Sequence, residues 1–175
     1  MMSSPFVHTI MGLLRIFFGI FMALMVSLSG FVAPADAASS AAIRAYDDVQ
    51  PTTQNYSGQN LVRAEFSDAK LQGVDFSNAD LTGAVFNGAN LRGANLHGIN
   101  FSDGIAYITN LAEADLTDAI FTSAMMLKSN FKDANVTGAD FSFAVIDREQ
   151  VSHLCKTASG TNPTTGVDTR ESLGC

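Results

Sequence analysis

Large apolar side chains recur at every fifth position from Leu61 to Ile146. Of the eighteen positions on this five-residue grid, only Ala106 carries a small side chain. A second column, mostly alanine, lies two residues before the grid, as Ala64 does before Phe66. Neither an α-helix, with about 3.6 residues per turn, nor a strand, with a repeat of about two, has this period. A fixed period predicts a repeat architecture in which each unit buries its apolar side against its neighbours.

Extended geometry explains why the two columns belong together. Residues i and i−2 of an extended segment share a face, so both columns point inward if the chain turns sharply after each grid residue. Gly, Asn and Asp tolerate the backbone conformations that such turns require. They fill most of the turn positions: Gly73, Gly83, Gly88, Gly93, Gly98, Gly138, Asp68, Asn78, Asp103, Asp118 and Asp133. The pattern predicts an all-β solenoid with a solid core.

The repeat unit has a five-residue consensus: alanine, then Asp or Asn, then leucine, followed by two further residues. It is found in Ala79-Asp80-Leu81-Thr82-Gly83, Ala89-Asn90-Leu91-Arg92-Gly93 and Ala114-Asp115-Leu116-Thr117-Asp118. With these motifs, about half of the chain resembles the pentapeptide-repeat family. The resemblance implies a right-handed quadrilateral β-helix with four repeats, or twenty residues, per coil. We assign residues 56–146 to this β-helix.

The first 37 residues have the pattern of a signal peptide. An uncharged apolar run covers residues 16–33, and Ala35-Asp36-Ala37 before Ala38 matches an A-x-A cleavage site. The alternative is an uncleaved membrane anchor, because the run is long enough to span a bilayer. Gly19, Gly30 and Pro34 weaken that alternative. We expect residues 1–37 to be cleaved between Ala37 and Ala38, which leaves no membrane attachment.

Residues 38–55 precede the grid. The segment 38–46 contains good helix formers, and Pro51 would end a helix there. A short N-terminal helix could block the open end of the first coil, as solenoids require. An irregular lead fits the composition equally well. Tyr56 falls on the grid and is expected to begin the first turn.

Residues 147–175 follow the grid and are expected to form a C-terminal cap. Residues 147–156 predict a short helix with Asp147 as its N-cap and Val151 and Leu154 on one face. Cys155 and Cys175 are the only cysteines of the chain. In an exported protein they favour a disulfide, closing a loop of about twenty residues and contributing roughly 3 kcal/mol. The alternative is two free thiols.

The tail carries a second resemblance that bears on location. Residues 154–160, Asn162-Pro163 and residues 169–175 are similar to the tail of thylakoid-lumen pentapeptide-repeat proteins. This resemblance implies the thylakoid lumen, with the periplasm as the second choice.

Catalytic patterns are nearly absent from the sequence. His153 and Cys155 lie two residues apart, but no further residues have metal-ligand spacing, and Cys155 is expected to be in the disulfide. The recurring glycines are explained by turns and not by a phosphate-binding loop. We therefore predict a protein that is not an enzyme and that has no cofactor and no metal.

With twenty residues per coil, residues twenty apart stack about 4.8 Å above one another. Asn90, Asn110 and Asn130 then form an amide ladder, and Asp75, Asn95, Asp115 and Asn135 form a column that alternates acid and amide. A third column differs, because it is apolar where the family has Asp or Asn. We call this column and its two neighbours the apolar stripe: Val85, Ile105, Met125 and Val145, with Tyr107 and Leu127 beside them.

Three explanations of the apolar stripe are open. A terminal segment could fold back over it, the weak repeat at residues 104–108 could invert and turn Ile105 and Tyr107 inward, or the stripe could be an interface. The interface explanation makes the chain an exported, non-enzymatic interaction or scaffold protein that binds a homodimer partner or another protein and no nucleic acid. The alternative function is a DNA mimic that binds a type II topoisomerase, as some family members do. The net charge of −7 is compatible with that alternative, whereas export is not.

Overall fold

The computed structural model describes residues 55–175. The expected signal peptide 1–37, its cleavage point between Ala37 and Ala38, and residues 38–54 of the lead lie outside the described residues. So does the proposed N-terminal helix.

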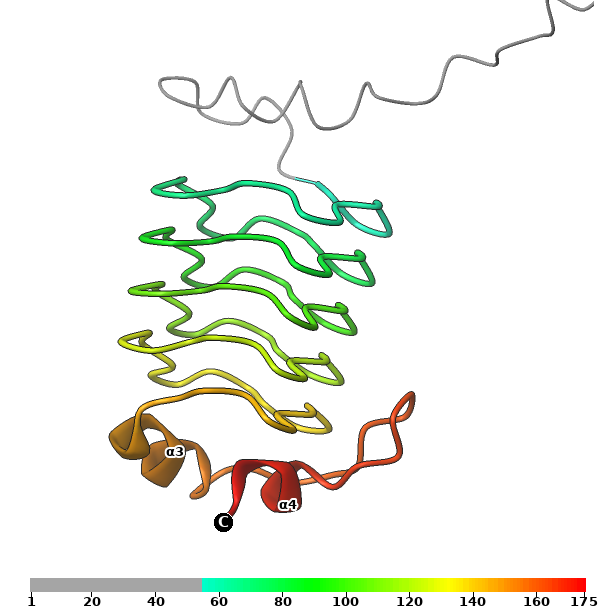
Figure 1. The fold of residues 1–175 in the computed structure, drawn as a ribbon, viewed down its shortest axis with the longest axis vertical. Coiled ribbons are helices and arrows are strands. Elements are labelled where there is room, and N and C mark those ends of the chain that lie inside the picture. Colours follow the sequence, from blue (N-terminus) through cyan, green and yellow to red (C-terminus); the bar gives the residue numbers. More distant parts are fainter. Residues whose placement is uncertain (1–54) are drawn as a thin grey trace, which may run out of the picture. The chain divides into compact units, whose positions relative to one another are not determined.

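The described chain winds into stacked coils (Figure 1). Parallel β-bridges join each outward residue to the residue twenty positions later, from Asn55–Asp75 to Met125–Val145. Within a coil the bridges recur every five residues, so four repeats complete one turn as predicted. Backbone hydrogen bonds connect each coil to the next in both directions: the Tyr56 N–H donates to Asp75 O at 2.6 Å, and the Asp80 N–H donates to Gln59 O at 2.9 Å. The stack is therefore held by backbone pairing along its whole length.

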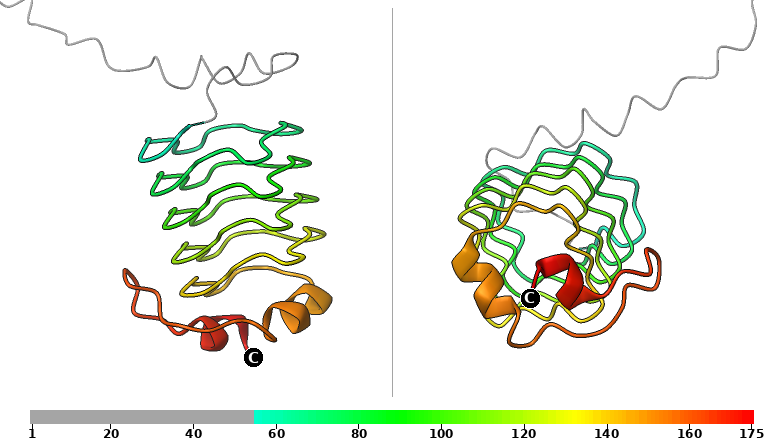
Figure 2. Two further views of the ribbon diagram at one scale, coloured as in Figure 1. Left: turned by 180° about the vertical axis from the view of Figure 1, so that it is seen from behind. Right: turned by 60° about the horizontal axis from the view of Figure 1, so that its bottom comes forward.

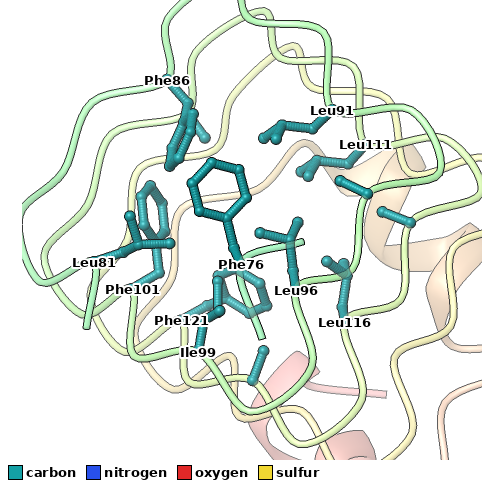
Figure 3. Close-up of a cluster of buried hydrophobic side chains, with 14 of the residues drawn as sticks. Phe76, Leu81, Phe86, Leu91, Leu96, Ile99, Phe101, Leu111, Leu116 and Phe121 are labelled. Atoms are coloured by element: carbon teal, nitrogen blue, oxygen red, sulfur yellow. The ribbon is translucent and has the colours of Figure 1, made fainter. Parts of the chain in front are cut away.

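The grid residues and the alanine column form one continuous core (Figure 3). Side chains such as Phe76, Leu96 and Phe121 point into the interior and are almost completely buried. Aromatic rings from successive coils stack directly, with ring centroids 4.8 Å apart for Phe66–Phe86 and 5.1 Å apart for Phe121–Phe141. Tyr56 is buried and continues this stacking, with its ring 4.9 Å from that of Phe76. The predicted inward columns are confirmed.

The corners of the coil impose a positive φ on the second residue after each grid position from Tyr56 to Phe141. Glycine, Asn and Asp account for most of these residues, as predicted. The same conformation is nevertheless imposed on Arg63, Ile108 and Phe143, at φ values of 57 to 59°. Such a value is unfavourable for ordinary side chains and most of all for a β-branched one. Coil closure therefore overrides local preference at these corners.

The weak repeat at residues 104–108 keeps the register of its neighbours, so the inversion that the sequence left open is wrong. The Ala106 side chain is buried, whereas that of Ile105 points outward. The reason is the backbone ladder, because Ile105 N donates to Ala84 O and Ala106 N donates to Met125 O. Neighbouring side chains close the space beside Ala106 to a cavity of about 10 Å³.

The C-terminal cap contains two helices below the last coil (Figures 1 and 2). Helix α3 covers Arg148–Leu154, close to the predicted range, and helix α4 covers Thr169–Leu173. Leu154 and Leu173 pack against the core and close its end. The expected capping bond of α3 is absent, because the Asp147 carboxylate instead accepts a hydrogen bond from the Lys128 backbone N–H.

Two further connections fasten the cap. Cys155 and Cys175 form a disulfide with an Sγ–Sγ distance of 2.12 Å, as the sequence predicted. The buried Asn162 amide donates to the backbone oxygens of Asp118 and Gly138 at 3.0 and 2.9 Å. The cap is therefore tied both to itself and to the coils above it.

Candidate interaction surface

The apolar stripe runs down one flat face of the coil stack. Consecutive β-bridges join Val85 to Ile105, Ile105 to Met125 and Met125 to Val145, which places the four side chains in one line. Met125 and Val145 are 45% and 47% exposed, Ile105 is 36% exposed, and Val85 is half-buried. Tyr107 and Leu127 are half-buried beside this line. The structure therefore brings all six predicted stripe residues onto one surface.

Two exposed apolar residues that sequence reasoning did not include adjoin the stripe. Phe143 is 85% exposed and lies at the corner that leads into the strand of Val145. Ile108 is 54% exposed and lies at the corner after Tyr107. Both residues lie at turns, where polar residues are expected, so the sequence pattern did not predict them as part of an apolar surface. Apart from Val62, every exposed large hydrophobic side chain of residues 55–175 lies in or beside the stripe.

A cation forms part of one border of the stripe. The Lys128 ammonium lies 5.3 Å from the centre of the Tyr107 ring, within the range of a cation–π contact. Its interaction with the Tyr107 side chain raises the pKa of Lys128 above the ordinary value. The lysine therefore stays charged and covers part of the tyrosine without burying the central line of the stripe.

The C-terminal segment does not cover the stripe, so this part of the fold-back explanation is wrong. Helices α3 and α4 lie below the last coil (Figure 1), and residues 159–162 pack beside it at the corner of Gly138. Met125 and Val145 remain about half exposed with that segment in place. The N-terminal segment lies outside the described residues.

The other outward columns have structural roles. Asn110 Nδ2 donates to Asn90 Oδ1 at 3.1 Å, and Asn130 Nδ2 donates to Asn110 Oδ1 at 3.3 Å, which forms the predicted amide ladder. In the alternating column, Asn95 Nδ2 donates to Asp75 Oδ1 at 3.0 Å. Hydrogen bonds from the backbone and hydroxyl of Ser77 lower the pKa of the Asp75 carboxyl. These columns satisfy their polar groups within the coil stack.

A surface groove beside α3 is a second feature that the sequence did not reveal. It encloses about 650 Å³, and its lining includes Lys132, Arg148, Lys156, His153 and one carboxylate, Glu149. Three of the basic side chains come from residues 148–156 and Lys132 comes from an earlier repeat, so the fold brings the two segments together. The groove could attract an anionic group, but the lining is surface-exposed or half-buried and holds no buried polar side chain.

The residues considered for catalysis and metal binding do not form a site. Cys155 is consumed by the disulfide, and within residues 55–175 no group of three or more His, Cys, Asp or Glu side chains could hold a metal ion. The helices described for this chain are all too short or too polar to cross a bilayer.

Comparison with known proteins identifies the repeat. The model of the pentapeptide-repeat family matches residues 57–103 and 109–144 with eight copies. The gap between the two matches coincides with the weak repeat around Ala106. Proteins of this family form right-handed β-helices, in agreement with the expected fold class.

Similar proteins come from the thylakoid lumen of Arabidopsis thaliana. The chain is 69% identical over 42 residues to thylakoid lumenal protein TL20.3 and 49% identical over 45 residues to thylakoid lumenal 15 kDa protein 1, both chloroplastic. These segments cover 24% and 26% of this chain but only 15% and 20% of the two relatives. A solved pentapeptide repeat protein from the same compartment is 34% identical, over 74% of this chain and 94% of that one, with a TM-score of 0.36.

Proposed function

Because this chain belongs to the pentapeptide-repeat family, we propose that it is a non-enzymatic interaction or scaffold protein of the thylakoid lumen. Its binding surface is the apolar stripe. The observation that supports this proposal is the concentration of exposed apolar side chains on one face of a coil stack in which two of the other outward columns carry polar ladders.

The stripe costs free energy as long as it faces water. Apolar surface is worth roughly 25 cal/mol per Å² when it is removed from water, so an aligned patch is a driving force for association. Nothing in the fold requires the patch, because the amide ladder shows that Asn fits the equivalent outward position on the next face. An interaction surface explains why apolar residues occupy this column.

The lumenal location rests on the relatives and on the leader. The relatives are lumenal, and the sequence of residues 1–37 fits a cleaved signal peptide. We propose that the native protein begins at Ala38. Intact-mass analysis of protein from its source should then give residues 38–175 with one disulfide, and a mass that includes residues 1–37 would contradict cleavage.

The interaction itself can be tested by affinity capture from the lumen and membrane fractions of the source cell. The bait is the protein expressed from its full sequence, beside the double variant Ile105→Asp/Met125→Asp. Val62→Asp is the matched control, because Val62 is also an exposed apolar residue but lies outside the stripe. We expect the double variant, but not the control, to lose its bound protein at least tenfold. Equal capture by all three baits would refute the stripe as the binding surface.

A further inference from the structure

We propose that the apolar stripe binds a second copy of this chain, face to face and antiparallel, about a two-fold axis that crosses the stripe between Ile105 and Met125. This inference rests on the proposed function, because it takes the stripe to be an interface and names its partner.

The face that carries the stripe can be described as three columns on four levels. The central column is the line from Val85 to Val145. The preceding-corner column, on the side where the chain enters each strand, contains Gly83, Asp103, Ser123 and Phe143. The following-corner column, on the side where the chain leaves, contains Asn87, Tyr107, Leu127 and Asp147. Successive levels are about 4.8 Å apart.

The position of the axis follows from the length of the apolar line. Above Val85 the same column continues with the exposed carboxylate of Glu65, and below Val145 the coils end. If the two-fold axis crossed the central column at another level, the Glu65 carboxylate would face an apolar side chain of the second copy, or part of the line from Val85 to Val145 would stay uncovered. An axis midway along the four levels opposes Ile105 to Met125 of the second copy and Val85 to its Val145. All four central residues are then buried against apolar side chains.

The following-corner column is complementary about the same axis. Its middle levels oppose Tyr107 to Leu127 of the second copy, an aromatic–aliphatic contact. Its outer levels oppose the Asn87 amide to the Asp147 carboxylate, which can accept a hydrogen bond from an amide N–H. Neither pair opposes two charges of the same sign.

The preceding-corner column provides the strongest shape argument. Phe143, the most exposed of the large hydrophobic side chains, is opposed to Gly83 of the second copy, which has no side chain. The Arg63 stem borders that glycine, with Cγ 3.4 Å from the place where a Gly83 Cβ would lie, so the ring would also meet a guanidinium group. The middle levels oppose the Asp103 carboxylate to the Ser123 hydroxyl. The antiparallel arrangement therefore gives an exposed ring a place to pack.

A parallel arrangement is less favourable. An axis along the coil stack would keep each residue on its own level and exchange the two corner columns. Asp103 would then oppose Tyr107, and Asp147, which already accepts the Lys128 backbone N–H, would oppose Phe143, so two carboxylates would be desolvated against aromatic rings. The sequence of the corners thus selects the antiparallel pair.

The size of the face sets the expected strength of association. With four levels about 4.8 Å apart and three columns across, the face is small and belongs to the low end of the size range of protein interfaces. We therefore expect a dimer that dissociates in the micromolar range and that forms at high local concentration.

Single-cysteine cross-linking tests the arrangement directly. The native cysteines are joined to each other, so a cysteine introduced at Val85 or Val145 is the reactive thiol. Facing sheets lie roughly 10 Å apart, which suits a short bismaleimide linker. We expect a mixture of V85C and V145C proteins, each expressed from the full sequence, to give a covalent dimer. Neither variant alone should cross-link efficiently, since its two thiols would be separated by three levels, roughly 14 Å along the stack.

His97→Cys, on the opposite face, mixed with V145C is the control and should give no dimer. Efficient cross-linking of V85C alone would overturn the proposal by showing a parallel pair. Two results together would overturn the second copy as partner. The mixture would give no cross-link, and sedimentation would show a monomer at about 100 micromolar, which is roughly tenfold above the expected dissociation constant.

This failure can be distinguished from failure of the proposed function. If no dimer forms but Ile105→Asp/Met125→Asp still loses captured protein, the stripe binds a different protein and the dimer alone is refuted. If the double variant instead acquires a protease-sensitive N-terminal segment and keeps its captured protein, that segment covers the stripe and both proposals are refuted.

Discussion

Asp140 is the one almost fully buried carboxylate of the described chain, at 2% exposure. Burial alone would raise its pKa, but hydrogen bonds from Ser142, Thr165 and Thr122 outweigh this effect and lower the pKa below its ordinary value of 3.8. A carboxyl with a lowered pKa in the folded state stabilises the fold above its unfolded pKa. That stabilisation is lost as the pH falls through the folded pKa.

The variant Asp140→Asn is expected to be less stable than the wild type by roughly 1–2 kcal/mol at pH 7, because it loses charge-assisted hydrogen bonds. The difference should shrink as the pH falls below about 4, since the wild-type carboxyl is then protonated. Urea unfolding at pH 7, 5 and 3 measures this difference in unfolding free energy between the variant and the wild type. Asp75→Asn is the matched comparison, because Asp75 occupies the equivalent outward position and also has a lowered pKa but is more exposed, so its difference should be smaller. A difference that stayed constant with pH would contradict this origin.

Ile108 shows what sequence reasoning at single residues could not predict. A β-branched residue rarely adopts a positive φ, so an isoleucine at this position does not predict a corner. The neighbouring coil determines the corner, through the hydrogen bond from the Ile108 N–H to Leu127 O. Phe143 was missed for the same reason, and with it the most exposed part of the interaction surface. Tertiary context and not local preference decides such positions.

At the scale of elements, the coils were predictable and the cap was predictable only in part. The coils repeat one pattern many times, so the period determines which side chains point inward. Helix α4 occurs once and spans five residues, so the sequence marks it only by Asp168 at its N-cap. In the structure the Asp168 carboxylate accepts hydrogen bonds from the N–H groups of Arg170 and Glu171. A helix this short is stable only because Leu173 packs on the core and Cys175 is tied to Cys155.

The disulfide is expected to stabilise this cap more than the coils. The double variant Cys155→Ser/Cys175→Ser should lose up to about 3 kcal/mol of unfolding free energy, as expected for a loop of about twenty residues. The hydrogen bond from Arg170 Nη1 to Cys155 O, 2.6 Å long, remains available and should limit the loss. Hydrogen exchange should show weakened protection in α4 while the coils stay protected. Unchanged exchange in α4 would contradict a role for the disulfide in holding the cap.

At the scale of the whole molecule, the distribution of charge bears on the two functions considered from the sequence. The net charge of −7 suits a DNA mimic, but the described faces are not uniformly acidic. Lys70 lies on the same face as the amide ladder, and Arg92 and Lys132 lie at the corner of that face. The surface groove beside α3 lies at its lower end. Arg92 forms a salt bridge to Glu113 at 2.6 Å on this side, so the Glu113 carboxylate is paired with a cation.

We therefore expect no inhibition of DNA supercoiling by a purified gyrase at low micromolar concentrations of this protein. An export signal points the same way, because it would separate the protein from a cytoplasmic topoisomerase. Dose-dependent inhibition that is lost on neutralising Asp75 and Asp115 would favour the DNA-mimic function instead.

The most direct test of the apolar stripe as an interface is hydroxyl-radical footprinting of Met125 in its native surroundings. Met125 is exposed in the isolated fold, whereas the adjacent Met126 is buried and serves as the internal control. We expect Met125 to be oxidised readily in dilute purified protein and to be protected at least several-fold in freshly isolated lumen and membrane fractions, with Met126 unreactive in both. Equal oxidation of Met125 in the two preparations would show that nothing occupies the stripe and would contradict the proposed function.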